Sequence, residues 1–214
     1  MDVVIAGGHG KIALRLARQL TTRGERVRSL IRNPDHTADV EAVGAEPVLF
    51  DLEQRSAEDL AEVVRGADAV VFAAGAGPGS GPERKRTVDF GGAVKLIDAA
   101  RSAGVRRYAM VSSIGADDPS AGSEEMRPYL EAKHDADEAL VASGLDYTIV
   151  RPGYLTDDPG TGKVKVGADV ARAEIPRDDV AAVLVGVLDE PRTIGTTFVV
   201  VSGDTPIPEA LKQL

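Results

Sequence analysis

The chain alternates short apolar runs with longer segments in which apolar residues recur at helical spacing. Residues 3–6 (Val-Val-Ile-Ala) form the first such run, and Ile12, Leu16 and Leu20 follow at i, i+4 and i+8. Strands that are apolar on both faces are typical of a parallel sheet that helices cover on both sides. The pattern therefore predicts an α/β fold, a Rossmann-type doubly wound parallel sheet flanked by helices.

The same alternation continues over most of the chain. We predict strands at residues 3–6, 26–31, 47–50, 69–73, 108–112, 147–150 and 197–201, and helices at 11–23, 39–43, 57–65, 83–103, 128–143 and 178–188. Residues 156–167 hold three glycines and one proline among charged residues, which predicts a loop or hairpin. The length of 214 residues suits one domain, 1–214, in which 155–177 form a small C-terminal region on the substrate side.

A glycine-rich turn joins the first predicted strand to the first helix. Gly7, Gly10 and Ala13 fit the pattern G-x-x-G-x-x-[G/A], in which glycine permits a tight turn and a close approach of the backbone to a pyrophosphate. The beginning of the helix offers unpaired N–H groups to phosphates. The sequence lacks the Gly-Lys-[Ser/Thr] that ends a P-loop. The residues predicted to bind the phosphates of a dinucleotide are Gly7, Gly8, His9, Gly10, Lys11 and Ile12; the alternative is a tight turn that binds nothing.

The end of the second predicted strand bears on the choice of dinucleotide. NAD-binding Rossmann proteins place an Asp or Glu there, which accepts hydrogen bonds from the adenosine ribose. This chain has Arg32 and Asn33 at that point. A guanidinium would pair with a 2′-phosphate, so Arg32, helped by Asn33, favours NADP (NADPH) over NAD. The nearby Asp35 weakens the case for NADP, because a carboxylate would repel a 2′-phosphate. The alternative is that Arg32 faces water and binds no cofactor.

Tyr129 and Lys133 lie four residues apart in a predicted helix and so share one of its faces. A nearby ammonium favours the phenolate, so Tyr129 would exchange a proton with a substrate hydroxyl or carbonyl. Lys133 would also bind the nicotinamide ribose. Ser113, after the fifth strand, would polarise the carbonyl, and Pro128 places Tyr129 in the first turn of its helix. The alternative is an exposed tyrosine and a solvated lysine on a surface helix.

The order of these motifs resembles the short-chain dehydrogenase/reductase superfamily, in particular its atypical NAD(P)-binding members of the biliverdin reductase B-like and NmrA-like group. The resemblance is carried by residues 6–13, 51–52, 73–75, 111–115, Tyr129 with Lys133, 146–153 and 176–181. It covers essentially the whole chain, and the block 147–153 (Tyr-Thr-Ile-Val-Arg-Pro-Gly) is its most specific part.

This resemblance implies further cofactor contacts. Asp51 and Leu52 would flank the adenine, although Asp51 also suits a turn cap. Ala73, Ala74 and Gly75 would line the adenosine ribose. The residues expected near the nicotinamide are Pro152, Gly153 and Tyr154, and the other implied cofactor contacts are Val111, Ser112 and Leu155.

Composition excludes several classes of protein. The net charge of −9 opposes binding to nucleic acid or an anionic membrane. The absence of cysteine excludes disulfides, zinc–thiolate sites and cysteine nucleophiles, and it suits a cytoplasmic protein. No apolar run approaches the roughly 18 residues that a membrane span needs. We expect no metal site, a small-molecule substrate, and a monomer or homodimer.

These features together predict an NADPH-dependent oxidoreductase that reduces a small carbonyl, quinone or flavin-type acceptor. Residues 75–82, 116–127 and 154–170 would face the substrate. One alternative is a non-catalytic NADP(H)-binding sensor of the NmrA-like kind. The other is a nucleotide-sugar epimerase or dehydratase, a branch that usually carries a larger C-terminal region than the sixty or so residues that follow Pro152 here.

Overall fold

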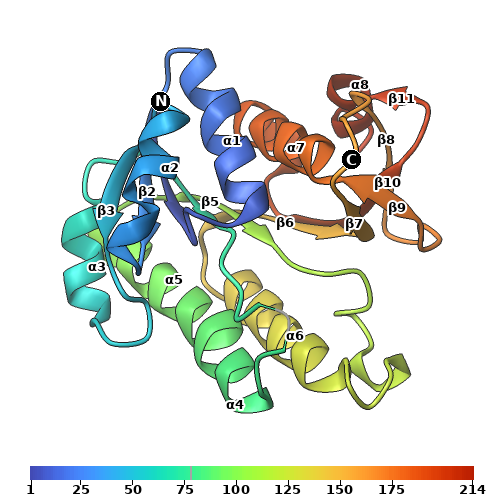
Figure 1. Ribbon diagram of the computed structural model, residues 1–214. Coiled ribbons are helices and arrows are strands. Elements are labelled where there is room, and N and C mark those ends of the chain that lie inside the picture. Colours follow the sequence, from blue (N-terminus) through green and yellow to red (C-terminus); the bar gives the residue numbers. More distant parts are fainter. Residues whose placement is uncertain (78) are drawn as a thin grey trace.

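The computed structural model describes residues 1–77 and 79–214, so Pro78, within the predicted loop 75–82, lies outside the described residues. A nine-stranded, mostly parallel sheet forms the centre, with strand order β11-β8-β10-β6-β5-β4-β1-β2-β3 (Figure 1). Its strands are β1 (Asp2–Ala6), β2 (Arg26–Ile31), β3 (Glu46–Leu49), β4 (Ala69–Phe72), β5 (Arg107–Val111), β6 (Asp146–Pro152), β8 (Lys163–Gly167), β10 (Thr196–Ser202) and β11 (Thr205–Pro206). The predicted Rossmann-type α/β fold is confirmed.

Helices cover both faces of this sheet (Figure 1). One face carries α1 (Lys11–Thr22), α2 (Thr37–Ala42), α7 (Arg177–Asp189) and α8 (Ile207–Leu211), and the other carries α3 (Ala57–Val64), α5 (Gly92–Ala103) and α6 (Arg127–Val141). Each face has its own hydrophobic core. Val3 and Ile5 of β1 belong to the first core and Val4 and Ala6 to the second, because successive side chains of a strand point to opposite faces.

The strand order reverses beside β1. β1 pairs in parallel with β2 on one side and with β4 on the other. From β1, the strands β2 and β3 follow on one side of the sheet, and β4, β5 and β6 follow on the other side. Adjacent crossover connections therefore diverge at the carboxyl ends of β1 and β4, and this divergence opens a crevice where such sheets bind ligands.

The C-terminal region contains more strands than its sequence indicates. Residues 163–167 form β8, which pairs antiparallel with β10, so the prediction of a loop or hairpin over 156–167 is wrong for these residues. Only Val164 of β8 is fully buried, because β8 lies near the edge of the sheet, and no apolar run marks it. β7 (Tyr154–Thr156) pairs with β9 (Glu174–Pro176) in a separate two-stranded sheet.

The helix predicted over 83–103 has three parts, which are α4 (Pro82–Arg84), a π-helical segment η2 (Lys85–Gly91) and α5. Single π turns inside helices often occur at functional sites. Asp89 lies in this segment and is buried, with 1% of its surface exposed. In the part of the chain described, no helix combines the length and apolar character needed to cross a membrane.

Candidate functional site

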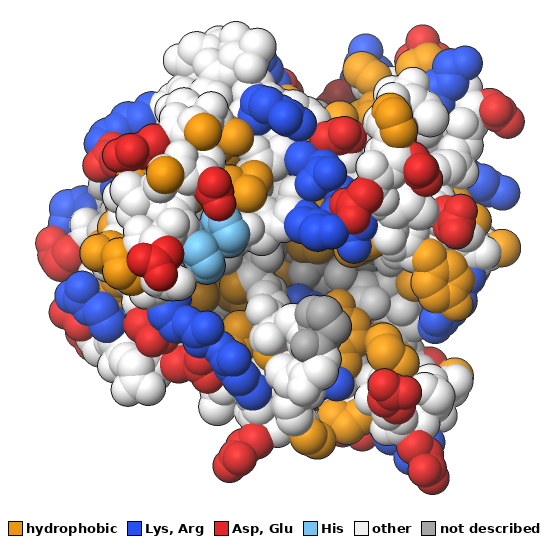
Figure 2. Space-filling model, in the orientation of Figure 1, with side chains coloured by type: hydrophobic (Ala, Val, Ile, Leu, Met, Phe, Trp, Pro, Cys, Tyr) orange, Lys and Arg blue, Asp and Glu red, His pale blue; other side chains and the backbone are white. Residues whose placement is uncertain are grey.

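A cleft lies beyond the carboxyl ends of the central strands. It consists of two hollows of about 310 and 500 Å³, which meet at residues 73–76 after β4. The smaller hollow borders the glycine loop and the ends of β2 and β3, and the larger one borders the ends of β5 and β6 and the beginning of α6. Figure 2 shows the hollowed face, with Lys and Arg side chains on both sides of it.

The glycine loop leaves no room for a side chain at Gly7 or Gly8. Gly7 has φ +81°, and a Cβ there would lie 2.5 Å from Cα of Ala74. A Cβ on Gly8 would lie 2.5 Å from Cβ of Ser29. Gly10 is the N-cap residue of α1. It has no side chain, so it provides no side-chain hydrogen bond to the first-turn N–H groups. These N–H groups, beside a backbone without Cβ atoms, fit a phosphate ligand.

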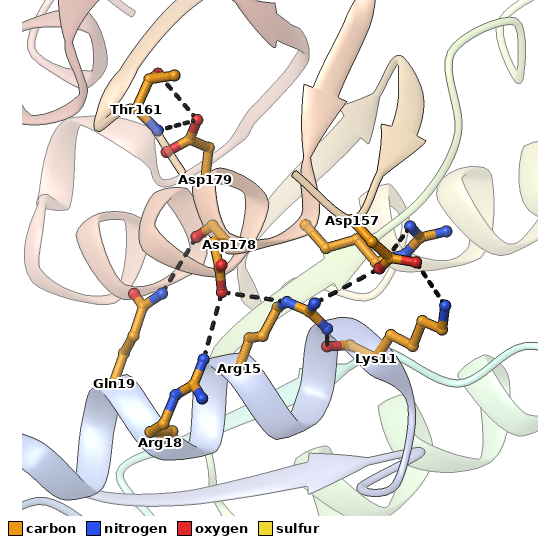
Figure 3. Close-up of polar contacts among 9 residues, drawn as sticks. Lys11, Arg15, Arg18, Gln19, Asp157, Thr161, Asp178 and Asp179 are labelled. Carbon is orange, nitrogen blue, oxygen red and sulfur yellow. Dashed lines mark hydrogen bonds and ion pairs between the residues drawn. The ribbon is translucent and has the colours of Figure 1, made fainter. Parts of the chain in front are cut away.

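Lys11, predicted to attract phosphate, pairs with a carboxylate of the C-terminal region (Figure 3). Its Nζ lies 2.6 Å from Oδ2 of Asp157, which follows β7. The other carboxylate oxygen of Asp157 lies 3.0 Å from Nη1 of Arg177 and 3.5 Å from Nη2 of Arg15. The hydrogen bond from Lys11 and the three positive charges lower the pKa of Asp157.

Further contacts tie the C-terminal region to α1 (Figure 3). Asp178, at the beginning of α7, lies 3.1 Å from Nε of Arg15 and 3.5 Å from Nη2 of Arg18. The buried Asp179 accepts hydrogen bonds from the N–H and the hydroxyl of Thr161. The helix that follows the glycine loop is therefore fixed to the segments that were predicted to face the substrate.

Arg32 lines the smaller hollow, and its Nη1 lies 3.2 Å from Oε2 of Glu53. The same oxygen lies 3.3 Å from Nη2 of Arg84, in α4. Glu53 was not predicted, because it follows β3 rather than β2. The structure thus places a carboxylate beside the end of β2, where the sequence has only arginine and asparagine.

The side chains of Asn33 and Asp51 each accept a hydrogen bond from a backbone N–H two residues further along the chain. Oδ1 of Asn33 accepts from the N–H of Asp35, and Oδ1 of Asp51 accepts from the N–H of Glu53. Asp51 lines the smaller hollow together with Leu52, whereas Asn33 does not line it.

Two histidines stack at the edge of the smaller hollow. The rings of His9 and His36 are 3.6 Å apart between centroids, and both residues line the hollow. Nε2 of His9 lies 2.7 Å from Oδ2 of Asp39 in α2. The imidazole of His9, predicted to contact phosphate, is therefore held between α2 and the turn that precedes it.

The three predicted catalytic side chains, Ser113, Tyr129 and Lys133, come together in the larger hollow. Tyr129 lies in the first turn of α6, as Pro128 predicts. Nζ of Lys133 lies 5.9 Å from the centroid of the Tyr129 ring. The residues after β5 and the beginning of α6 therefore come together, as expected from the order of Ser113, Tyr129 and Lys133 in the sequence.

Lys133 is paired with a carboxylate that the sequence pattern did not indicate. Its Nζ lies 3.3 Å from Oδ1 of Asp89 and donates to the carbonyl of Val111 at 3.2 Å. Oδ2 of Asp89 accepts from the N–H of Ala76 at 3.0 Å. Oδ1 of Asp89 has no hydrogen-bond donor among the described residues, and Asp89 lines the hollow. The only sequence signal for Asp89 is a single acid between apolar Val88 and Phe90.

Ser112 belongs to a buried network behind the cleft. Its hydroxyl donates to Oδ2 of Asp137 at 2.9 Å, and Nε of Arg151 donates to the same oxygen at 2.9 Å. Burial raises the pKa of Asp137, and Arg151 opposes this effect. These bonds join the end of β5, α6 and β6 and occupy the hydroxyl of Ser112, whereas the hydroxyl of Ser113 donates to the carbonyl of Ile114 at 3.3 Å.

Pro152, Gly153 and Leu155 line the larger hollow, whereas Tyr154 is 58% exposed and lies outside its lining. A Cβ on Gly153 would lie 2.1 Å from the carbonyl oxygen of Ala173, so β6 and the segment before β9 approach each other closely.

Most predicted site residues line the cleft. Those that do are Gly7, His9, Gly10, Arg32, Asp51, Leu52, Ala73, Ala74, Gly75, Val111, Ser112, Ser113, Tyr129, Lys133, Pro152, Gly153 and Leu155. Those outside the lining are Gly8, Lys11, Ile12, Asn33 and Tyr154. The structure adds His36, Glu53, Arg84, Lys85 and Asp89, and Glu125 and Met126 of the predicted substrate-facing segment 116–127 also line the cleft. Within residues 1–77 and 79–214, no group of three or more His, Cys, Asp or Glu side chains is arranged to hold a metal ion.

The glycine loop, the uncapped first turn of α1 and the crevice at the strand reversal together define a dinucleotide-binding Rossmann protein. The chain belongs to the NAD(P)H-binding family, whose profile matches residues 7–191. The predicted resemblance to NAD(P)-binding Rossmann proteins is confirmed.

Similar proteins carry names of more than one kind. A Bacillus subtilis protein named an uncharacterized sugar epimerase is 43% identical over the whole of both chains. A Bacillus halodurans structure titled "Putative NAD-dependent epimerase/dehydratase" is 40% identical and covers both chains fully, with a TM-score of 0.94. A Lactococcus lactis structure named an oxidoreductase is 30% identical and covers 100% of this chain and 96% of its own, with a TM-score of 0.90.

Proposed function

We propose that this protein is an NADPH-dependent reductase of a small carbonyl, quinone or flavin-type acceptor. The observation that carries the proposal is the junction of the two hollows at residues 73–76, with Arg32 in one and Ser113, Tyr129 and Lys133 in the other. The smaller hollow would hold the adenosine end of the dinucleotide. The larger one, at about 500 Å³, has the size of a small-molecule site and would hold the nicotinamide and the acceptor.

The glycine loop and the first turn of α1 would bind the pyrophosphate through backbone N–H groups. Arg32 would bind the 2′-phosphate, which supports NADPH as the reductant. When bound, NADPH supplies a hydride to the acceptor.

Side chains that line the larger hollow would supply the proton that the acceptor takes up when it is reduced. The hydroxyl of Ser113 would donate a hydrogen bond to the acceptor oxygen, and Tyr129 would donate the proton as negative charge develops there. Lys133 would keep a positive charge beside the phenol of Tyr129, and the ion pair with Asp89 would hold Lys133 in position. General acid catalysis of this kind contributes about 100-fold or more to a rate.

Acceptor-dependent oxidation of NADPH tests the proposal. A panel of carbonyls, quinones and flavins is screened with the parent protein, and the best acceptor is then used with Tyr129→Phe. We expect this variant to lose about 100-fold in kcat while its Kd for NADPH stays within about twofold. Tyr147→Phe, in β6 outside the cleft lining, is the matched control and should keep the parent rate. If no acceptor accelerates the oxidation although NADPH binds, the reductase proposal fails and the sensor alternative is supported.

A sugar epimerase or dehydratase is the second candidate, because two of the similar proteins carry such names. An epimerase regenerates its cofactor, so it would retain NAD through purification and would consume no NADPH. Denaturing the purified protein and identifying the released nucleotide separates the two candidates. Most residues after Pro152 form β7, β8, β9, α7, β10, β11 and α8, and this favours a small acceptor over a nucleotide sugar.

A further inference from the structure

Glu53 lies at the centre of an ion cluster in the smaller hollow. Its Oε2 lies 3.2 Å from Nη1 of Arg32 and 3.3 Å from Nη2 of Arg84, and its Oε1 accepts from the hydroxyl of Thr87 at 2.7 Å. The N–H of Glu53 donates to Asp51 at 2.8 Å. Glu53 is therefore held through its backbone and through both carboxylate oxygens, by residues from the end of β2, the segment after β3, and the helical run α4–η2.

The side chains of Arg32, Arg84 and Glu53 together carry one net positive charge in a chain whose net charge is −9, and the carboxylate of Asp51 lines the same hollow. The side chains of Arg32 and Arg84 are 53% and 41% exposed, whereas that of Glu53 is 22% exposed. The carboxylate is thus the more enclosed partner, and both guanidinium groups present a free surface to a ligand.

We infer that Arg84 is a second 2′-phosphate-binding residue and that Glu53 sets the selectivity between NADPH and NADH. This inference rests on the proposed function, because it requires the adenosine ribose to lie in the smaller hollow. A phosphate monoester carries about −1.5 to −2 charges at pH 7, so both arginines attract it and the carboxylate of Glu53 repels it. A ribose without the phosphate donates hydroxyl hydrogens to a carboxylate. Glu53 therefore favours NADH, while the two arginines favour NADPH.

The size of the effect follows from Coulomb's law. Two charges about 6 Å apart, at an effective dielectric constant of about 40, interact strongly enough to change an affinity about tenfold, and salt reduces this value. Glu53→Gln removes the charge and keeps one side-chain oxygen, which can accept from the arginines while the amide nitrogen donates to the hydroxyl of Thr87. We expect this variant to raise the affinity for a 2′-phosphate roughly 3- to 10-fold.

Titrations with 2′,5′-ADP and 5′-AMP at low salt test the inference without any turnover. The proteins are the parent, Arg32→Ala, Arg84→Ala, Glu53→Gln and the control Glu83→Gln, an exposed acid in α4 with the same charge change. We expect both arginine variants to lose about tenfold in 2′,5′-ADP affinity and to keep their 5′-AMP affinity within about twofold. Glu53→Gln should gain affinity for 2′,5′-ADP only, and Glu83→Gln should behave as the parent.

The outcomes separate this inference from the proposed function. If the parent binds 2′,5′-ADP no better than 5′-AMP, and Arg32→Ala leaves both affinities unchanged, the NADPH proposal fails and the inference fails with it. If Arg32→Ala weakens 2′,5′-ADP binding but Arg84→Ala and Glu53→Gln do not alter the ratio of the two affinities, the inference alone is overturned.

Discussion

Replacing Asp89 with asparagine should destabilise the protein strongly, although the change is nearly isosteric. The side chains of Lys133 and Asp89 are 4% and 1% exposed, and Nζ and Oδ1 lie 3.3 Å apart. Asparagine can still accept from the N–H of Ala76, but among the described residues the ammonium of Lys133 then keeps a single hydrogen bond, to the carbonyl of Val111. Leaving one charge of a buried pair without its partner costs about 3–5 kcal/mol.

Urea unfolding measures this cost in the parent, Asp89→Asn, Lys133→Met and the double variant. For a chain of this length each kcal/mol corresponds to about 2–4 °C in Tm, so Asp89→Asn should lower Tm by roughly 6–20 °C. The double variant should lose less than the sum of the two single variants, because it buries no unpaired charge. Asp98→Asn, at an exposed position of α5, is the control and should change the free energy of unfolding by less than about 0.5 kcal/mol.

A loss below about 1 kcal/mol in Asp89→Asn would refute this reasoning, because it would mean that water or another group already solvates the ammonium. Additive losses in the double variant would refute it as well, since they would show that the two charges do not interact.

Two further predictions concern the C-terminal region. Gly153→Ala would place a Cβ 2.1 Å from the carbonyl of Ala173, so urea unfolding should show a loss of about 1–3 kcal/mol, whereas Gly81→Ala, with open space around its Cβ, should lose much less. Gly153→Ala with the stability of the parent would mean that β6 and the segment before β9 are not in contact. Asp157 should contribute stability above its ordinary pKa of 3.8 and lose this contribution as the pH falls through its lowered folded pKa, because protonation breaks the pairs with Lys11 and its neighbours. The difference in unfolding free energy between the parent and Asp157→Asn should therefore shrink from pH 6 to pH 2, and a constant difference would contradict the pairing.

The fold and the glycine loop were predictable because their signals are local. The apolar run 3–6, the glycines that follow it and the helical spacing of Ile12, Leu16 and Leu20 are read within twenty residues. Local patterns of this kind report the period of a strand or helix and the need for a turn. Tyr129 and Lys133 were likewise found by their spacing on one helix.

The partners of these residues were not predictable, because they come from distant segments. Lys11 meets Asp157 across 146 positions in the chain, and Arg32 meets Glu53 across 21. β8 was missed because this strand, near the edge of the sheet, fully buries only Val164 and so shows no apolar run.

By itself, the sequence determined a doubly wound sheet with a glycine loop at its first turn, since hydrophobic period and backbone freedom are properties of neighbouring residues. Only the tertiary structure decided which charges share the cleft, placing Asp89 beside Lys133 and Glu53 between Arg32 and Arg84. The physical reason is that an ion pair depends on the distance between two side chains, and for residues far apart in the chain that distance is set by how helices and loops pack over the sheet.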